Sequence, residues 1–237
     1  MDRSLIDPFP DAPDPTLYVS REASDLALAR LLACARRPDS PAALLAPPGL
    51  GKTLLLHTLA RLLPELSCVY VPNPSLSPAE LCGWSLGRLG SPTWNDPIPV
   101  LAAYAAHRAQ QGGALLWLVD DAHSLPEETA RWLGNALAGS RGALRLVAAA
   151  LDDEERIKNL DALGPLVRIE ALARPMSAAE TRSYVETRLE RTGLAAETRE
   201  RCDEGVVQWV HETAGGVPRE VGDSVSALLS GRLPPPD

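Results

Sequence analysis

One stretch of the chain, residues 46–53 (APPGLGKT), has the residue types and spacing of a phosphate-binding loop. The apolar run 42–45 precedes it and a helical pattern at 54–63 follows it, which is the strand, loop and helix order that a P-loop needs. Gly49 and Gly51 let the backbone turn tightly and bring its N–H groups close to phosphate oxygens. The helix that follows begins with unpaired N–H groups and a positive dipole end, and both favour an anion.

Two side chains of this loop carry the expected chemistry. Lys52 is expected to reach the β- and γ-phosphates of a nucleotide, and the Thr53 hydroxyl is expected to hold Mg²⁺. The chain has only two lysines, Lys52 and Lys158, so a lysine at this position argues against a chance glycine turn before a helix. The loop departs from the usual motif at Ala46, where a methyl group fits if φ stays negative. The predicted nucleotide-binding residues are Tyr18, Pro48, Gly49, Leu50, Gly51, Lys52, Thr53 and Leu54.

A pair of carboxylates follows a second apolar run. Residues 114–119 (ALLWLV) are continuously apolar, as is typical of a parallel strand buried on both faces, and Asp120 and Asp121 come directly after them. Open α/β sheets bind ligands at the carboxyl ends of their strands. We therefore expect Asp120 to share the Mg²⁺ with Thr53, and Asp121 to position or activate the attacking water. His123 either senses the γ-phosphate or packs at the start of the next helix.

The N-terminal segment, residues 5–20, contains too many prolines for a helix and should run extended over the surface. Phe9 and Tyr18 are its apolar anchors. The segment either braces the surface or forms one wall of a base pocket beside the P-loop.

The hydrophobic pattern alternates between strands and helices and then becomes wholly helical. Strands are predicted at 42–45, 68–71, 114–119, 144–150 and 167–172, and helices at 21–36, 54–63, 77–90, 97–111, 124–138, 153–160, 177–191, 204–212 and 218–229. This order predicts an α/β P-loop NTPase fold, a parallel sheet flanked by helices and followed by a small all-helical lid. We expect an α/β nucleotide-binding domain at 1–174, with an extended segment at 1–20, a helical lid at 175–232 and a proline-rich tail at 233–237.

Composition limits the partners and the compartment. The 237 residues carry a net charge of −8, which argues against broad, passive nucleic-acid binding. The four cysteines form no C-x-x-C motif and suggest small buried side chains in a reducing cytoplasm. We expect a cytoplasmic protein with no signal peptide and no membrane span. One basic group is either an ordinary solvated face or a local DNA contact, and consists of Arg141, Arg145, Arg156 and Lys158.

Several short segments occur together with the P-loop in a fixed order. They are PDP at 13–15, YVS at 18–20, the P-loop, VPNPSLS at 71–77, DDAH at 120–123 and GVPR at 216–219. In this order they resemble the AAA+ ATPases typified by general secretion pathway protein A, together with their relatives among transposition-helper ATPases. The resemblance covers nearly the whole chain.

The resemblance also implies roles for two arginines. Arg219 matches the sensor 2 arginine, which touches the γ-phosphate within its own subunit. Arg168 matches an arginine finger, which acts on the nucleotide of a neighbouring subunit. Besides Ala46, two positions depart from the pattern: Asp121 stands where relatives more often carry glutamate, and the residues around Leu151 are apolar where a polar sensor is usual.

Together these features predict an oligomeric AAA+ ATPase, a ring or filament, that binds and hydrolyses Mg-ATP to switch or assemble a partner complex. The expected catalytic residues are Asp120, Asp121, Arg168 and Arg219, and the expected cofactors are ATP and Mg²⁺. Two alternatives remain. One is a nucleotide-gated scaffold with little hydrolysis, which Asp121 and the apolar sensor position favour. The other is a DNA-bound ATPase of the transposition type, which the acidic composition disfavours.

Overall fold

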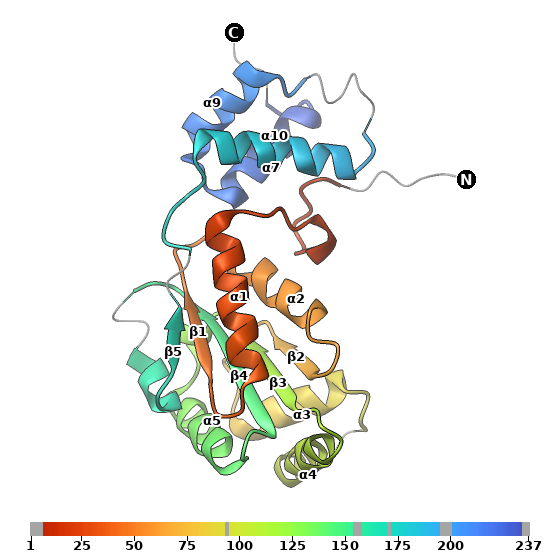
Figure 1. Ribbon diagram of the computed structural model, residues 1–237, viewed down its shortest axis with the longest axis vertical. Coiled ribbons are helices and arrows are strands. Elements are labelled where there is room, and N and C mark those ends of the chain that lie inside the picture. Colours follow the sequence, from red (N-terminus) through yellow and green to blue (C-terminus); the bar gives the residue numbers. More distant parts are fainter. Residues whose placement is uncertain (1–6, 93–94, 154–157, 170–171, 195–200, 234–237) are drawn as a thin grey trace, which may run out of the picture.

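Five parallel strands form one sheet in the computed structural model, which describes residues 7–92, 95–153, 158–169, 172–194 and 201–233 (Figure 1). The strands lie in the order β2-β3-β4-β1-β5. Their bounds are β1 Ala42–Leu45, β2 Ser67–Val71, β3 Leu115–Val119, β4 Leu144–Ala150 and β5 Val167–Ile169. The predicted α/β fold with a parallel sheet is confirmed.

Helices cover both faces of the sheet because β3 is apolar on both sides, and all of its residues are buried. Leu115, Trp117 and Val119 pack with α3, α4 and α5, whereas Leu116 and Leu118 pack with α1 and α2. The bounds of these helices are α1 Glu22–Arg36, α2 Lys52–Arg61, α3 Pro78–Arg88, α4 Pro97–Gln110 and α5 Glu127–Gly139. In the described part of the chain, no helix is both long enough and apolar enough to cross a membrane.

The prediction of a helix at 153–160 has to be corrected. Its described end belongs to a 3₁₀ helix, η3 (Lys158–Leu163), and residues 154–157 lie outside the described residues. Leu160 and Leu163 are both buried in the cluster that contains the α5 side chains. A spacing of three residues puts side chains on one side of a 3₁₀ helix, so this local winding lets both leucines face α5.

Strand β5 is shorter than predicted. The prediction ran over 167–172, but β5 ends at Ile169 and Leu172 lies in a turn, with residues 170 and 171 outside the described part. Leu172 is nevertheless fully buried in the core. An apolar residue that packs inward from a turn therefore extended the strand pattern in the sequence. β5 is an edge strand of the sheet, next to β1.

Three helices follow the sheet and pack around an apolar cluster of their own. They are α7 Ala178–Arg191, α9 Glu204–Ala214 and α10 Pro218–Leu229, called the C-terminal helices below. A capping box of Ser177 and Glu180 begins α7. Phe9 of the N-terminal segment is buried in this cluster, so the first described residues lie between the C-terminal helices and the rest of the chain (Figure 1). Residues 234–237 of the predicted tail lie outside the described part.

The turn between α9 and α10 is tied to the start of the C-terminal helices at Gly216. The Met176 N–H donates to the Gly216 carbonyl at 2.8 Å. Gly216 has φ +70°, and a Cβ placed on it would lie 2.1 Å from the Met176 carbonyl oxygen. The neighbouring Gly215 also has a positive φ, +57°, but a Cβ there would meet no atom within 4 Å. A side chain at either glycine would therefore strain the backbone, but only a side chain at Gly216 would also collide with a neighbouring atom.

We predict that Gly216→Ala destabilises the protein more than Gly215→Ala does. Both variants place a Cβ in the left-handed region, at a cost of about 1–2 kcal/mol. Only Gly216→Ala also pushes a methyl group into the Met176 carbonyl, which adds roughly 1–3 kcal/mol. Thermal and urea unfolding of the two variants and the unsubstituted protein measures the difference. Equal losses of stability would mean that the close approach at Gly216 does not constrain this turn.

Candidate nucleotide-binding site

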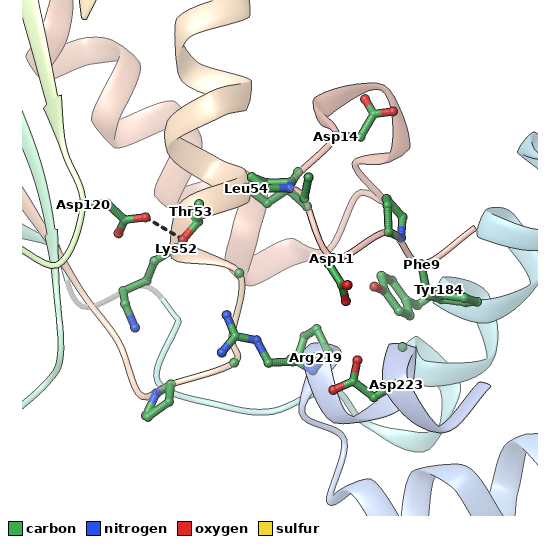
Figure 2. Close-up of a pocket in the computed structure, with 18 of the residues that line it drawn as sticks. Phe9, Asp11, Asp14, Lys52, Thr53, Leu54, Asp120, Tyr184, Arg219 and Asp223 are labelled. Atoms are coloured by element: carbon green, nitrogen blue, oxygen red, sulfur yellow. Dashed lines mark hydrogen bonds between the residues drawn. The ribbon is translucent and has the colours of Figure 1, made fainter. Parts of the chain in front are cut away.

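A cavity of about 480 Å³ opens where the P-loop, the end of β3, the N-terminal segment and the C-terminal helices meet (Figure 2). This volume is in the range of small-molecule sites. Its lining includes every predicted loop residue from Pro48 to Leu54 except Leu50, which is 3% exposed and belongs to the core beneath the loop. Asp120, Asp121 and Arg219 also line it.

The P-loop needs its two glycines for different reasons. Gly49 has φ +76° and Gly51 has φ +95°, both in the left-handed region that favours glycine. A Cβ on Gly49 would lie 2.6 Å from Val217, whereas a Cβ on Gly51 would meet nothing within 4 Å. The Arg219 N–H donates to the Gly49 carbonyl at 3.2 Å. The start of α10 therefore rests directly on the P-loop.

Ala46 fits at the first position of the motif because it belongs to the core. It is fully buried among the side chains of α1 and α2, and it is not among the residues with positive φ. The condition set by the sequence, a negative φ at this position, is therefore met.

Lys52 lies at the start of α2 and the residue is only 7% exposed. Its Nζ donates to the carbonyl oxygens of Ala46 and Pro47, at 2.9 Å each. Burial is the main factor that lowers the pKa of Lys52; Arg219 lowers it further, while Asp120 and Asp121 oppose the shift. The ammonium group thus gains from any anion that enters the cavity.

Asp120 is the most tightly held acid of the site, with 5% exposure. Its Oδ2 accepts from the Thr53 hydroxyl at 2.6 Å and from the Tyr70 hydroxyl at 3.0 Å, and its Oδ1 accepts from the Asp121 N–H at 3.0 Å. Burial, followed by the Asp120 charge, raises the pKa of Tyr70, so this hydroxyl remains a donor. Tyr70 was not predicted as a site residue.

Thr53 and Asp120 fit the predicted Mg²⁺ site in their chemistry. A hydroxyl and a carboxylate are hard oxygen ligands, and they lie side by side at the edge of the cavity. The described residues contain no group of three or more His, Cys, Asp or Glu side chains that could hold a metal by themselves. Mg²⁺ suits such a site because it usually keeps several waters and shares phosphate oxygens of the substrate.

Asp121 faces the same cavity from an unusual backbone position. It is exposed, with φ 45° and ψ 40°, and begins the short 3₁₀ helix η2 (Ala122–Ser124). Leu151, just after β4, also lines the cavity, so the predicted sensor position presents an apolar side chain to it. His123 is not part of the lining, and its Nδ1 is buried with no hydrogen-bond partner in the described part of the chain.

The two arginines singled out by the sequence lie in different places. Arg219, at the start of α10, is exposed and points into the cavity toward the P-loop (Figure 2). Together with Lys52 it brings two positive charges to one cavity. Arg168, on the edge strand β5, does not line the cavity; it forms an ion pair with Asp161 of η3, and its side chain is 42% exposed.

Tyr18, predicted to contact the nucleotide, is not in the cavity lining. Its hydroxyl donates to Asp25 at 2.7 Å, and its ring packs on the core beside α1 and α2. Phe9, the other aromatic anchor of the same segment, faces the cavity instead, as expected if this segment forms one wall of the pocket. The short 3₁₀ helix η1 (Pro15–Leu17) turns the chain between these two aromatic residues.

Arg188 is a cavity residue that was missed from the sequence. It is 7% exposed, its Nη1 donates to the Pro8 carbonyl at 2.9 Å, and its guanidinium lies 5.1 Å from the Tyr184 ring and 5.8 Å from the Phe9 ring. These contacts hold the N-terminal segment against α7. The sequence does carry a feature that could have identified Arg188: it is a charged residue on the buried face of α7, three residues after Val185.

Comparisons with known proteins agree with this geometry. A family model described as "AAA domain" matches residues 35–157, just over half of the chain. No curated protein matches. Solved structures with a similar fold include Cdc6p of Pyrobaculum aerophilum, with 19% identity, 91% of this chain and 63% of that chain covered, and a TM-score of 0.63.

Two further structures are similar over nearly the whole chain. The Walker-type ATPase of Pyrococcus abyssi has 15% identity, with 94% of this chain and 72% of that chain covered and a TM-score of 0.68. The Orc1 protein of Aeropyrum pernix, solved in complex with DNA, has 18% identity, with 97% of this chain and 65% of that chain covered and a TM-score of 0.65. At these identities the likeness shows the fold. The chain spans less than two thirds of the Cdc6p and Orc1 chains.

We predict that Lys52→Ala weakens ATP binding by about 1.5–3 kcal/mol, because it removes a charge-assisted contact to the phosphates. The matched control is Lys158→Ala, which removes the only other lysine, an exposed residue of η3. Titration of both variants with a fluorescent ATP analogue measures the affinity. An ATP affinity that Lys52→Ala leaves unchanged would exclude residues 46–53 as the phosphate-binding loop.

Proposed function

The chain belongs to the AAA domain family, and from this premise we propose that it is an oligomeric AAA+ ATPase that binds and hydrolyses Mg-ATP to switch or assemble a partner complex. The observation that carries the proposal is the convergence of Lys52, Thr53, Asp120 and Arg219 on one cavity. The narrower resemblance to the general secretion pathway protein A group stays a prediction.

In the proposed binding step, the triphosphate lies along the P-loop with its charge facing Lys52 and Arg219. The loop N–H groups and the start of α2 add donors and a favourable dipole. Arg219 belongs to α10, so an anion held by its side chain is also in contact with the C-terminal helices. The Arg219 N–H donates to the Gly49 carbonyl and joins α10 to the P-loop. We therefore propose that residues 175–232 act as a lid whose position responds to the nucleotide.

In the proposed hydrolysis step, Thr53 and Asp120 would hold Mg²⁺, and Asp121 would accept a hydrogen bond from the attacking water. The metal held there would supply positive charge to offset the negative charge that develops on the phosphates. Asp121 is suited to this role because its carboxylate is exposed to the cavity rather than paired within the sheet. Arg219 would stabilise charge on the γ-phosphate from within the same subunit.

Oligomerisation is proposed from the position of Arg168. The residue belongs to the edge strand of the sheet, away from its own cavity, and Asp161 holds its side chain at the surface. An arginine placed in this way serves a neighbouring nucleotide better than its own. A homo-oligomer would then complete each site with a charge from the next subunit.

A nucleotide-gated scaffold with little hydrolysis is the second candidate. The observation that favours it is Leu151, an apolar side chain in the cavity at the predicted sensor position. Asp121 adds to it, because aspartate reaches less far than the glutamate usual in relatives. In this case binding would be intact and turnover slow, unless a partner supplies the missing polar group.

A DNA-bound ATPase is the third candidate, and one of the similar structures, Orc1, was solved with DNA. The basic group suggested from the sequence gives it little support. Arg145 is half-buried and donates to the carbonyls of Ala35 and Gly142, so it serves the fold. Arg156 lies outside the described residues. ATPase assays with and without double-stranded DNA, beside Lys52→Ala, separate this candidate from the other two.

We predict that Asp121→Asn keeps ATP bound but lowers turnover by at least about 10²-fold, because the amide no longer accepts a proton from water. Asp120→Ala should in addition impair Mg²⁺-dependent binding, since it removes the carboxylate beside Thr53. Nucleotide titrations and phosphate-release assays on the two variants measure these effects separately. Equal turnover in the unsubstituted protein and Asp121→Asn, with measurable hydrolysis in both, would exclude Asp121 as the base.

We also predict that hydrolysis rises more than linearly with protein concentration, and that Arg168→Ala binds ATP normally but loses about 10³-fold in turnover. Mixing Arg168→Ala with Asp121→Asn should restore part of the activity, because intact acids of one subunit meet the intact arginine of another. The readout is phosphate release at several protein concentrations and mixing ratios. A specific activity independent of concentration, with no rescue on mixing, would contradict an arginine acting between subunits.

A further inference from the structure

Four side chains, those of Thr53, Asp120, Tyr70 and His57, form a chain of contacts at the end of β3. The Asp120 carboxylate accepts from Thr53 on one side and from Tyr70 on the other, both at Oδ2. The Tyr70 ring lies 4.3 Å from the His57 ring, centroid to centroid, at an angle of 47°. Thr53 and His57 are four residues apart on α2, so they share one face of that helix. The first and the last residue of this chain of contacts, Thr53 and His57, therefore lie about one turn apart on α2.

The sheet places Tyr70 in this position. It pairs in register with Leu118, and the Asp120 N–H donates to the Val71 carbonyl at 2.9 Å, so the ladder continues to Asp120. Side chains two residues apart on a strand share a face, and Tyr70 and Asp120 therefore both face α2. The Trp84 Nε1–H donates to the Tyr70 carbonyl at 3.1 Å and fixes the end of β2. The backbone of Tyr70 is thus fixed by strand pairing and by Trp84, and its ring packs against His57.

We propose that Tyr70 is a positioning residue that fixes the Asp120 carboxylate for Mg²⁺, an inference that rests on the proposed function. Thr53 has to turn its hydroxyl oxygen toward the metal while donating to Asp120. The Oδ1 contact comes from the adjacent peptide, so Tyr70 supplies the donor from a different strand. His57 supports the Tyr70 ring from α2. Partners that orient a metal ligand in this way typically contribute about 10–100-fold to metal affinity or activity.

The test is Tyr70→Phe, which keeps the ring and its contact with His57 and removes only the hydroxyl. Binding of a fluorescent ATP analogue is measured first in EDTA and then during a Mg²⁺ titration, beside the unfolding temperature. The matched control is Tyr104→Phe, which removes a hydroxyl that bonds to Ser67 at 3.0 Å, at the other end of β2. We expect the half-saturating Mg²⁺ concentration to rise about tenfold in Tyr70→Phe alone, with the EDTA affinity and unfolding temperature unchanged.

Each other outcome overturns the proposal in a distinguishable way. An unchanged Mg²⁺ dependence in Tyr70→Phe, with a clear dependence in the unsubstituted protein, overturns the role of Tyr70 and leaves the proposed function standing. An equal loss of affinity with and without Mg²⁺, or a shift that Tyr104→Phe reproduces, means that the hydroxyl serves the fold only. Absence of nucleotide binding by the unsubstituted protein in both buffers overturns the proposed function together with the inference.

Discussion

A buried ammonium group must be surrounded by oxygen atoms, and the ligand-facing edge of this protein is built around that constraint at Lys52. The carbonyls of Ala46 and Pro47 provide the oxygens, and they can do so because the loop folds back through two residues with positive φ. The loop connects the buried strand β1 to α2, and these two elements fix the position of the Lys52 ammonium group. Arg219 and Arg188 bring two further positive charges to the lining of the same cavity. Five aspartates also line the cavity: Asp120 and Asp121 at the end of β3, Asp11 and Asp14 on the N-terminal segment, and Asp223 on α10. Lys52 and Arg219 therefore mark the part of the cavity that favours an anion.

Much of this arrangement could be predicted because it is encoded locally. A glycine loop between an apolar run and a helix, or two acids after a buried strand, needs only a few adjacent residues to be identified. Arg188 and Tyr70 could not be found in this way, because their partners lie far away in the chain: Pro8 is 180 residues from Arg188, and Asp120 is 50 residues from Tyr70. Tyr18 and Phe9 show the same limit. Both were plausible aromatic residues, and the turn at η1 decides which one faces the cavity.

The groups proposed for binding and those proposed for hydrolysis differ in how they are held. Lys52, Thr53 and Asp120 are fixed by short hydrogen bonds within one subunit. Asp121 is exposed on a strained backbone, and Arg168 lies on the edge strand outside the cavity. On the proposed function, a single subunit is therefore organised for holding a nucleotide, and turnover depends on what an assembly adds.

The position of Phe9 has a mechanical consequence. Because Phe9 is buried among the C-terminal helices and the Arg188 guanidinium donates to the Pro8 carbonyl, the first described residues are anchored to these helices rather than to the sheet. Gly222 leaves room for this anchor, since a Cβ there would lie 3.2 Å from the Phe9 ring. If residues 175–232 move as the proposed lid, a cargo fused ahead of Phe9 would move with the C-terminal helices. Arg191 of α7 also donates to the Tyr18 carbonyl at 2.5 Å, so the attachment of the N-terminal segment to the C-terminal helices extends from Phe9 as far as Tyr18.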